Sequence, residues 1–343
     1  TINGSLAGEF AKYQRSLVKE YLSWQVDLVN EYKKDFQFVT HNFDFEWRDY
    51  SYGIQPDVNH FEAAEPLDFV GIDVYHPSQS QLTGTENSFA GDVARSIKHQ
   101  NYLVLETQAQ AFKSWTPFPG QLYQLAFNHI ANGANMIEYW HWHSIHNSFE
   151  TYWKGLLSHD FEPNPVYDAA QKVGHDFDRL SDKLVNLNHA ADVAFVVDNE
   201  SLTATSSDWI EFAIGKDVNY NDVFRRLYDT FYKLNVRTDI LNPKTINLSD
   251  YALVVVPMLY VSDETFLKAL NQYIHDGGNV LFTFKDGVTD EHVKVRTDIQ
   301  PAIIREAIGA HYHMFVDPNG ETLEDQTGIF EDTDLHISEW AEL

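Results

Sequence analysis

Residues 102–115 read Tyr-Leu-Val-Leu-Glu-Thr-Gln-Ala-Gln-Ala-Phe-Lys-Ser-Trp, and the rest of the chain can be organised around them. The first four residues are continuously apolar, which is typical of a parallel strand that is covered on both faces. Glu106 follows this strand directly. A lone Glu at a strand end is usually a solvated residue. However, α/β barrels keep their reactive groups at the C-terminal ends of their strands, so Glu106 is a candidate catalytic carboxylate.

Apolar stretches and helical patterns alternate on both sides of this strand. Strands are expected over 36–43, 69–75, 102–106 and 136–142, and helices over 6–32, 89–99, 121–132 and 166–187. In the first helix, apolar residues recur at steps of three and four, so this face is expected to pack against the protein. Strands that alternate with helices predict a parallel sheet. Four such units within residues 1–188 fit the C-terminal half of a (β/α)8 TIM barrel, because a complete barrel takes about 250 residues.

The sequence changes in character after residue 188. Strands are expected over 193–197, 238–241, 252–257 and 279–284, and helices over 220–234, 263–275 and 301–308. This pattern predicts a doubly wound Rossmann-like domain over 189–343, truncated at its C-terminal end, with a fold like that of class I amidotransferases. Amidotransferase activity is excluded, because it needs a Cys at the strand-to-helix turn, and the turn after 252–257 carries Met258, Leu259 and Tyr260 instead. Nucleotide binding is not expected either, because Gly277-Gly278 ends a helix, whereas a phosphate loop opens one.

The composition narrows the choice of partners. The net charge of −27 opposes nucleic acids and anionic membranes, since both bind basic surfaces. No apolar run approaches the ~18 residues of a membrane span. The absence of Cys removes disulfides, thiolate metal sites and Cys nucleophiles, and it suits a cytoplasmic protein. Aromatic residues make up 14% of the chain, more than a core requires, and such excess rings often stack on sugars or bases.

Polar residues close the four expected strands of the first domain and are expected to meet at one edge. They are His41 and Asn42, Asp73 and Tyr75, Glu106, and His141 and His143. A carboxylate among aromatic rings fits a carbohydrate site. Glycoside hydrolysis needs a second carboxylate as well, ~5–5.5 Å away in a retaining enzyme. The histidines at 141, 143 and 146 could supply metal ligands, but the sequence identifies no clustered third ligand, so neither a metal nor a cofactor is expected.

Several motifs resemble those of the glycoside hydrolase family 42 β-galactosidases. They are Glu106-Thr-Gln, Trp115-Thr-Pro, Asn132-Gly-Ala-Asn-Met-Ile-Glu-Tyr-Trp-His-Trp-His143 and Glu150-Thr-Tyr-Trp-Lys-Gly-Leu-Leu-Ser-His159. The resemblance covers the whole chain, because the second domain is similar to the trimerisation domain of that family. It implies a (β/α)8 barrel, retaining hydrolysis of terminal β-D-galactosyl residues of oligosaccharides, and a homotrimer.

The resemblance also implies roles for single residues. It places the nucleophile on Glu106 and the Tyr that hydrogen-bonds the nucleophile on Tyr75. The galactose-contacting Trp and Glu fall on Trp115 and Glu150. Trp153 stands where many relatives have a His, and it is expected to form part of the wall around the galactose.

The acid/base of the family is the Glu of an Asn-Glu pair after the fourth strand. The strands here resemble the fifth to eighth, so this Glu is expected upstream of the chain, in a missing N-terminal barrel half. Two Asn-Glu pairs do occur, at 30–31 on a helix and at 199–200 in an expected loop of the second domain, and neither is expected to be catalytic. The alternative to half of a β-galactosidase is a non-catalytic sugar-binding and oligomerisation fragment.

Overall fold

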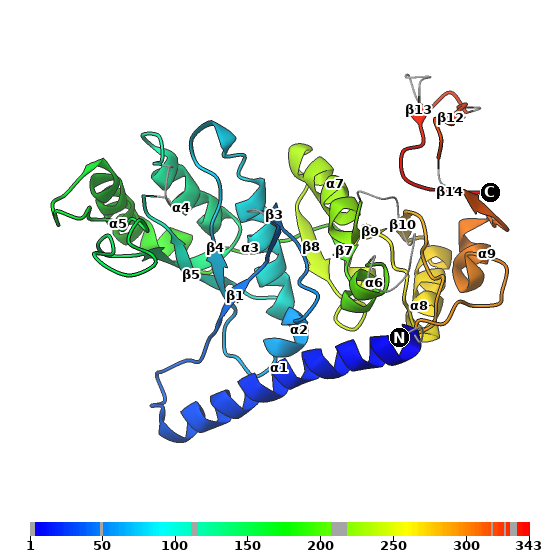
Figure 1. Cartoon of the computed structure of the whole chain (residues 1–343), viewed down its shortest axis with the longest axis horizontal. Coiled ribbons are helices and arrows are strands. Elements are labelled where there is room, and N and C mark those ends of the chain that lie inside the picture. Colours follow the sequence, from blue (N-terminus) through cyan, green and yellow to red (C-terminus); the bar gives the residue numbers. More distant parts are fainter. Residues whose placement is uncertain are drawn as a thin grey trace. The chain divides into compact units, whose positions relative to one another are not determined.

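The structure is a computed structural model that describes residues 4–48, 51–110, 116–206, 218–316, 318–325, 327–329 and 335–343. The chain forms two compact units (Figure 1). The first unit consists of residues 16–191 with 237–240, and the second of residues 1–15, 192–236 and 241–343. The domain boundary at residue 188 stays a prediction, and each unit is described by itself.

The first unit contains a four-stranded sheet in the order β1-β4-β5-β6. Its strands are β1 (Asn42–Asp44), β4 (Gly71–Val74), β5 (Tyr102–Gln108) and β6 (Ala134–Trp140). All three neighbouring pairs are parallel. The helices of this unit are α2 (His60–Ala63), α3 (Thr85–Lys98), α4 (Gln121–Ala131) and α5 (Pro165–Leu184), with a short 3-10 helix, η1, at Gln79–Gln81. The predicted parallel sheet with intervening helices is thus confirmed.

The segment before β1 differs from the prediction, because residues 36–41 are not part of a strand. Phe36 and Phe38 are exposed. The N–H of Val39 instead donates to the carboxylate of Asp68 at 2.7 Å, and its carbonyl accepts from the N–H of Asp68 at 2.9 Å. Sequence reasoning also missed an antiparallel hairpin, β2 (Glu46–Arg48) with β3 (Ser51–Tyr52).

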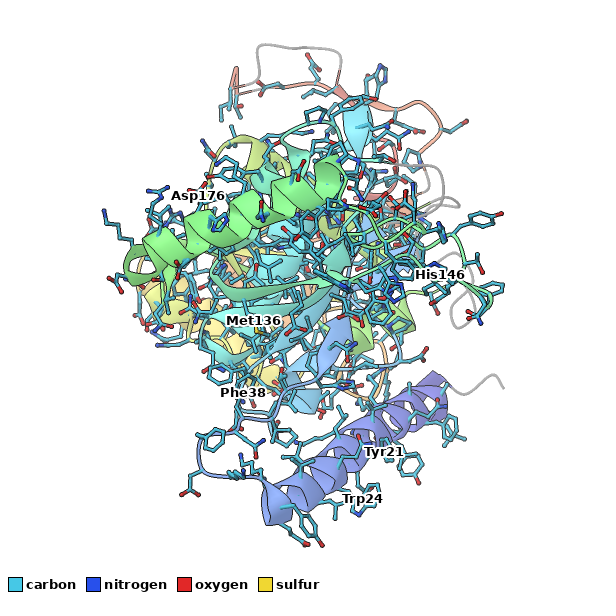
Figure 2. The ribbon with its side chains drawn as sticks, turned by 90° about the vertical axis from the view of Figure 1, so that its left-hand side faces the viewer. Tyr21, Trp24, Phe38, Met136, His146 and Asp176 are labelled. Carbon is cyan, nitrogen blue, oxygen red and sulfur yellow. The ribbon has the colours of Figure 1, made fainter. Side chains whose placement is uncertain are left out.

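Helix α1 (Gly4–Tyr32) forms over the predicted range, but the prediction of its packing face was wrong. The predicted apolar face is 42–78% exposed at every position, namely Leu6, Phe10, Tyr13, Leu17, Tyr21, Trp24, Leu28 and Tyr32. We call these eight residues the α1 stripe. Figure 2 shows Tyr21 and Trp24 pointing outward from the helix. The buried positions of α1 include Arg15, Leu22 and Val26 instead.

A buried ion-pair network is centred on Arg95 of α3. Its guanidinium donates to Asp92 at 2.9 Å and to Asp239 at 3.0 Å. It also donates to the backbone carbonyls of Asn132 and Thr238, at 3.1 and 2.9 Å. The side chains of Arg95, Asp92 and Asp239 are only 7%, 8% and 16% exposed. Such a network is sensitive to the loss of one partner, because the remaining charges stay buried.

We expect Arg95→Met to lower the free energy of unfolding by about 3–5 kcal/mol, because two largely buried carboxylates would lose their counter-ion. Arg179→Met is the matched control, since the guanidinium of Arg179 is 66% exposed where it pairs with Asp176. The control is expected to leave the urea midpoint nearly unchanged. Urea unfolding followed by circular dichroism measures both variants, and equal midpoint shifts would contradict the expectation.

The second unit is also α/β. Its four-stranded sheet has the order β10-β9-β7-β8, and residues 238–240 of β8 are grouped with the first unit. Its strands are β7 (Val193–Val196), β8 (Thr238–Leu241), β9 (Leu253–Val256) and β10 (Asn279–Phe282). The β7–β9 and β9–β10 pairs are parallel. The helices are α6 (Asn199–Ala204), α7 (Tyr220–Lys233), α8 (Glu264–His275) and α9 (Arg305–Ile308), with 3-10 helices η2 (Leu248–Asp250) and η3 (Ala302–Ile304). Two short antiparallel pairs follow, β11 (Phe315–Val316) with β14 (Ala341–Glu342) and β12 (Thr322–Leu323) with β13 (Leu335–His336).

The Asn-Glu pair of this unit lies in a helix, not in the predicted loop. Asp198 caps α6, since its carboxylate accepts from the N–H of Ser201 at 2.7 Å. Glu200 therefore falls in the first turn of the helix, where its carboxylate accepts from Arg15 at 3.0 Å. This ion pair gives Glu200 a structural role that needs no catalysis.

Candidate active site

Three carboxylates lie in a row across the sheet of the first unit. Glu106 is half-buried within β5, two residues before that strand ends at Gln108. In the strand register Glu106 is paired with Asp73 of β4, and Asp73 is paired with Asp44 of β1. Register partners of parallel strands point to the same face of a sheet, so these side chains share one face. Their mutual repulsion opposes full ionisation of the row.

Each carboxylate oxygen of Glu106 has a neighbouring donor. The hydroxyl of Tyr75, which follows β4 directly, donates to Oε2 at 3.0 Å. The amide Nδ2 of Asn42 donates to Oε1 at 3.4 Å, and the same nitrogen donates to Oδ2 of Asp73 at 2.9 Å. Glu106 is therefore held in a defined orientation from both sides.

The backbone around Tyr75 is fixed by buried groups. The hydroxyl of Tyr52, which is fully buried, accepts from the N–H of Tyr75 at 2.6 Å and donates to its carbonyl at 2.7 Å. The N–H of His76 donates to the side-chain oxygen of Gln108 at 3.0 Å. Burial, and then the nearby Glu106 carboxylate, raise the pKa of Tyr75 well above its usual range, so its hydroxyl stays a donor.

The surroundings of Asp73 shift its pKa strongly upward. Burial raises its pKa to about 7, and the Glu106 and Asp44 carboxylates act in the same direction. The hydrogen bond from Asn42 opposes this shift. Oδ1 of Asp73 is buried and has no hydrogen-bond partner among the described residues. Protonation of Asp73 near neutral pH is the expected response to such surroundings.

Of the predicted substrate-binding residues, the structure brings Trp153 next to the Glu106–Tyr75 pair. The Trp153 ring packs edge-on against the Tyr75 ring, with centroids 5.2 Å apart. The N–H of Trp153 donates to the carbonyl of Glu150 at 2.8 Å, while the side chain of Glu150 is exposed. Trp115 lies outside the described residues.

The loop that carries Trp153 passes close to the end of β6. A Cβ at Gly155 would lie 2.6 Å from the carbonyl oxygen of His141 and 2.7 Å from the carbonyl carbon of His143. Both contacts are with backbone that cannot easily move, so only Gly fits here. This close approach sets the path of the loop.

The histidines after β6 contact other rings. The His143 and His146 rings meet edge-on with centroids 5.5 Å apart, and His146 stacks on Phe161 at 4.5 Å (His146 is labelled in Figure 2). Within the described ranges, no group of three or more His, Asp or Glu side chains could hold a metal ion. These ring contacts indicate that His143 and His146 help to pack the loop.

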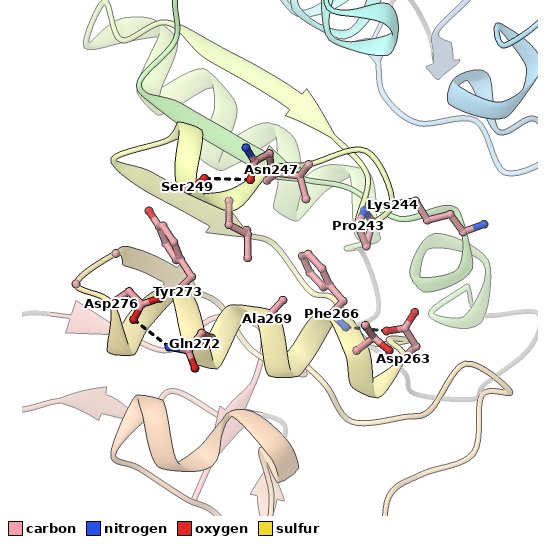
Figure 3. Close-up of a pocket in the computed structure, with 15 residues that line it drawn as sticks. Pro243, Lys244, Asn247, Ser249, Asp263, Phe266, Ala269, Gln272, Tyr273 and Asp276 are labelled. Carbon is pink, nitrogen blue, oxygen red and sulfur yellow. Dashed lines mark hydrogen bonds between the residues drawn. The ribbon is translucent and has the colours of Figure 1, made fainter.

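A groove of about 890 Å³ lies in the second unit, between α8 and the segment 243–249 (Figure 3). Its acidic residues have structural partners. Asp263 caps α8 by accepting from the N–H of Phe266 at 2.8 Å, and Asp276 accepts from Gln272 at 2.9 Å. The groove therefore offers no set of free reactive groups comparable to the row around Glu106.

Sequence reasoning placed Asn42 and Asp73 at strand ends but gave them no role, and it overlooked Asp44. The available signal was the period of two along a strand. Asn42 and Asp44 share one face of β1, and Asp73 and Tyr75 share one face of β4. The pattern within a single strand does not show how neighbouring strands are aligned, so the alignment of these faces with Glu106 could not be predicted from the sequence.

Comparison with known proteins identifies the family. Residues 1–180 match the family model for glycoside hydrolase family 42, described as beta-galactosidase, and residues 191–343 match the beta-galactosidase trimerisation domain. Both matched families describe glycoside hydrolases. The chain belongs to glycoside hydrolase family 42.

Individual relatives agree with this assignment. The chain is 24% identical over 343 residues to beta-galactosidase BgaA of Clostridium cellulovorans, covering 95% of this chain and 49% of that protein. It is 29% identical over 321 residues to beta-galactosidase Bga of Halorubrum lacusprofundi, covering 88% of this chain and 43% of that protein. The chain thus spans about half the length of the curated relatives it matches.

Solved structures show the same fold. The beta-galactosidase from Bacillus circulans sp. alkalophilus superposes with a TM-score of 0.84 at 20% identity, covering 99% of this chain and 50% of that one. The beta-galactosidase from Halorubrum lacusprofundi gives a TM-score of 0.78 at 26% identity, covering 94% of this chain and 48% of that one. In the part of the chain that the structure describes, no helix has the length and apolarity needed to cross a membrane.

Proposed function

We propose that this chain provides the nucleophile side of a retaining β-galactosidase, with Glu106 as the nucleophile. The observation that carries the proposal is the geometry of Glu106, whose two oxygens are held by Tyr75 and Asn42. A carboxylate oriented in this way can attack a carbon atom along a fixed direction. Membership of family 42 supports a terminal β-galactoside as the substrate class.

In the proposed reaction, one oxygen of Glu106 attacks the anomeric carbon while the bond to the leaving oxygen breaks. A separate acid protonates the leaving oxygen. It then acts as a base on the water that cleaves the galactosyl ester and restores Glu106. Trp153 lies beside Tyr75 and is proposed to form a wall of the galactose site, together with Trp115. Glu150 is proposed to bind galactose hydroxyls once substrate is present.

The acid/base is proposed to come from a segment outside these 343 residues. Two observations support this. The chain spans only about half the length of its relatives. All eight apolar residues of the α1 stripe are exposed, and exposed apolar residues of this kind often mark an interface. The first unit is proposed to be the C-terminal half of the (β/α)8 barrel, and the second a Rossmann-like domain that assembles the protein as a homotrimer.

A non-catalytic sugar-binding and oligomerisation module is the second candidate. This candidate is favoured because the two carboxylates nearest Glu106 are engaged in other hydrogen bonds. Asp73 accepts from the Asn42 amide, and Asp44 accepts from the N–H of Glu46 at 2.7 Å. Neither is placed as the opposing acid/base. The two candidates differ in whether a covalent intermediate forms.

A mechanism-based label tests the proposed nucleophile. A 2-deoxy-2-fluoro-β-galactoside with a dinitrophenolate leaving group is expected to label Glu106, because this leaving group departs without protonation. Trypsin releases the peptide 99–113, in which Glu106 is the only carboxylate side chain, so mass spectrometry locates the label unambiguously. The same reagent in the gluco configuration is the control. A label on any other peptide would refute the assignment of Glu106.

A further inference from the structure

The Asn42 amide connects two carboxylates of the row. Its Nδ2 atom lies 2.9 Å from Oδ2 of Asp73 and 3.4 Å from Oε1 of Glu106. The three residues come from three neighbouring strands, β1, β4 and β5, so the sheet register fixes their spacing. An amide carries donors on its nitrogen only, and therefore its orientation decides whether Glu106 faces a donor or an acceptor.

We propose that Asp73 is a positioning residue, which acts through the Asn42 amide to hold Glu106 in its reactive orientation. This inference rests on the proposed function of Glu106 as the nucleophile. It adds a role for two residues that do not need to touch the substrate. The role depends on the ionisation state of Asp73.

Ionised Asp73 can only accept hydrogen bonds, so it requires the NH2 group of Asn42 to face it. The same NH2 group then donates its second hydrogen to Glu106. Protonated Asp73 can donate to the amide oxygen of Asn42, which permits the amide to turn over. The amide oxygen would then face the Glu106 carboxylate and repel it. We therefore infer that the ionised form of Asp73 supports catalysis.

The charge on Glu106 acts back on Asp73. The titratable groups that face Asp73 are Asp44 from β1, Glu106 from β5 and Tyr75 from its own segment. When Glu106 becomes a neutral galactosyl ester, one negative charge beside Asp73 disappears, and its proton is released more easily to solvent. Formation of the intermediate thus favours the Asp73 form that orients Asn42.

Carboxyl ¹³C NMR of the 343-residue chain tests this coupling without any turnover. The pKa of Asp73 is near 7 because of burial and of its two acidic neighbours. Glu106→Gln and Asp44→Asn are each expected to lower it, since each removes one of these charges. Asn42→Ala is expected to raise it, since the stabilising hydrogen bond is lost. Identical Asp73 titrations in all four proteins would overturn the inference.

Kinetics of the protein assembled with a family 42 N-terminal half test the effect on catalysis. Asp73→Asn and Asn42→Ala are each expected to lower kcat/KM about tenfold, and the double variant by no more than either alone, because both remove one contact. The acidic limb of the kcat/KM profile is expected near pH 7 and to vanish in Asp73→Asn. Asp44→Asn is expected to move the limb to lower pH. Glu162→Gln, at an exposed position, is the control and is expected to leave both the alkaline plateau and the acidic limb unchanged.

Additive losses in the double variant, or an unchanged acidic limb in Asp73→Asn, would overturn the inference while leaving Glu106 as the nucleophile. Conversely, full activity of Glu106→Gln would refute the proposed function, whereas the NMR coupling among Asn42, Asp73 and Glu106 would still be observed. Circular dichroism confirms that each variant is folded. Failure of the inference about Asp73 and failure of the proposed function of Glu106 therefore give different experimental results.

Discussion

Glu106→Gln is expected to lower kcat/KM for p-nitrophenyl β-galactoside by about 10⁴-fold or more. Gln keeps the size of the side chain, and its carbonyl oxygen can still accept from the Tyr75 hydroxyl. Its amide cannot form the galactosyl ester, so the first step of the double displacement is lost. The measurement is a steady-state assay of the protein assembled with a family 42 N-terminal half.

Two further variants are compared with Glu106→Gln. Glu162→Gln makes the same chemical change at an exposed position and is expected to leave kcat/KM unchanged. Tyr75→Phe removes a single hydrogen bond to a charged group, worth about 1.5–3 kcal/mol, and is expected to cost about 10–100-fold. Retention of more than about 1% of activity by Glu106→Gln would rule out Glu106 as the nucleophile, because truncation of a nucleophile costs far more.

The sequence was sufficient where a local pattern has only one physical solution. The apolar run 102–105 is buried or half-buried in β5, and the strand–helix alternation gives the parallel sheet. Glu106 was a candidate from its position at a strand end, and the resemblance to family 42 gave roles to Glu106 and Tyr75. In the structure the Tyr75 hydroxyl lies 3.0 Å from Oε2 of Glu106. Their roles stay proposals, since the distance shows contact and not chemistry.

The sequence was insufficient where the outcome depends on a partner. The α1 stripe has the period of a buried helix face, but periodicity does not show which surface covers that face. Likewise, residues 36–41 contain the aromatic and β-branched residues that favour a strand, yet the backbone of Val39 forms hydrogen bonds with Asp68 and not with a neighbouring strand. The Asn42 bridge is a product of register between strands far apart in sequence, which no local pattern contains.

The second large expected effect is on the rate of lactose hydrolysis, and it depends on where the acid/base lies. If this group lies outside the chain, the 343 residues alone resemble an enzyme with its acid/base removed. Lactose, whose leaving group must be protonated, is expected to react about 10²–10⁴-fold more slowly with the chain alone than after addition of the N-terminal half. Chromatographic detection of released galactose measures this ratio, and equal rates would show that an acid/base lies within the chain.

A dinitrophenyl β-galactoside separates the two steps of the reaction in the chain alone. Its leaving group needs no acid, so Glu106 can still form the galactosyl ester, but no base then activates water. Azide attacks the ester without a base, and two successive inversions give β-galactosyl azide. We expect azide to accelerate turnover of the chain alone and to have little effect once the N-terminal half is added. The Glu106→Gln chain should form no azide product, which ties the rescue to the ester on Glu106. An α-configured azide would instead indicate direct displacement on the substrate and would contradict a covalent intermediate.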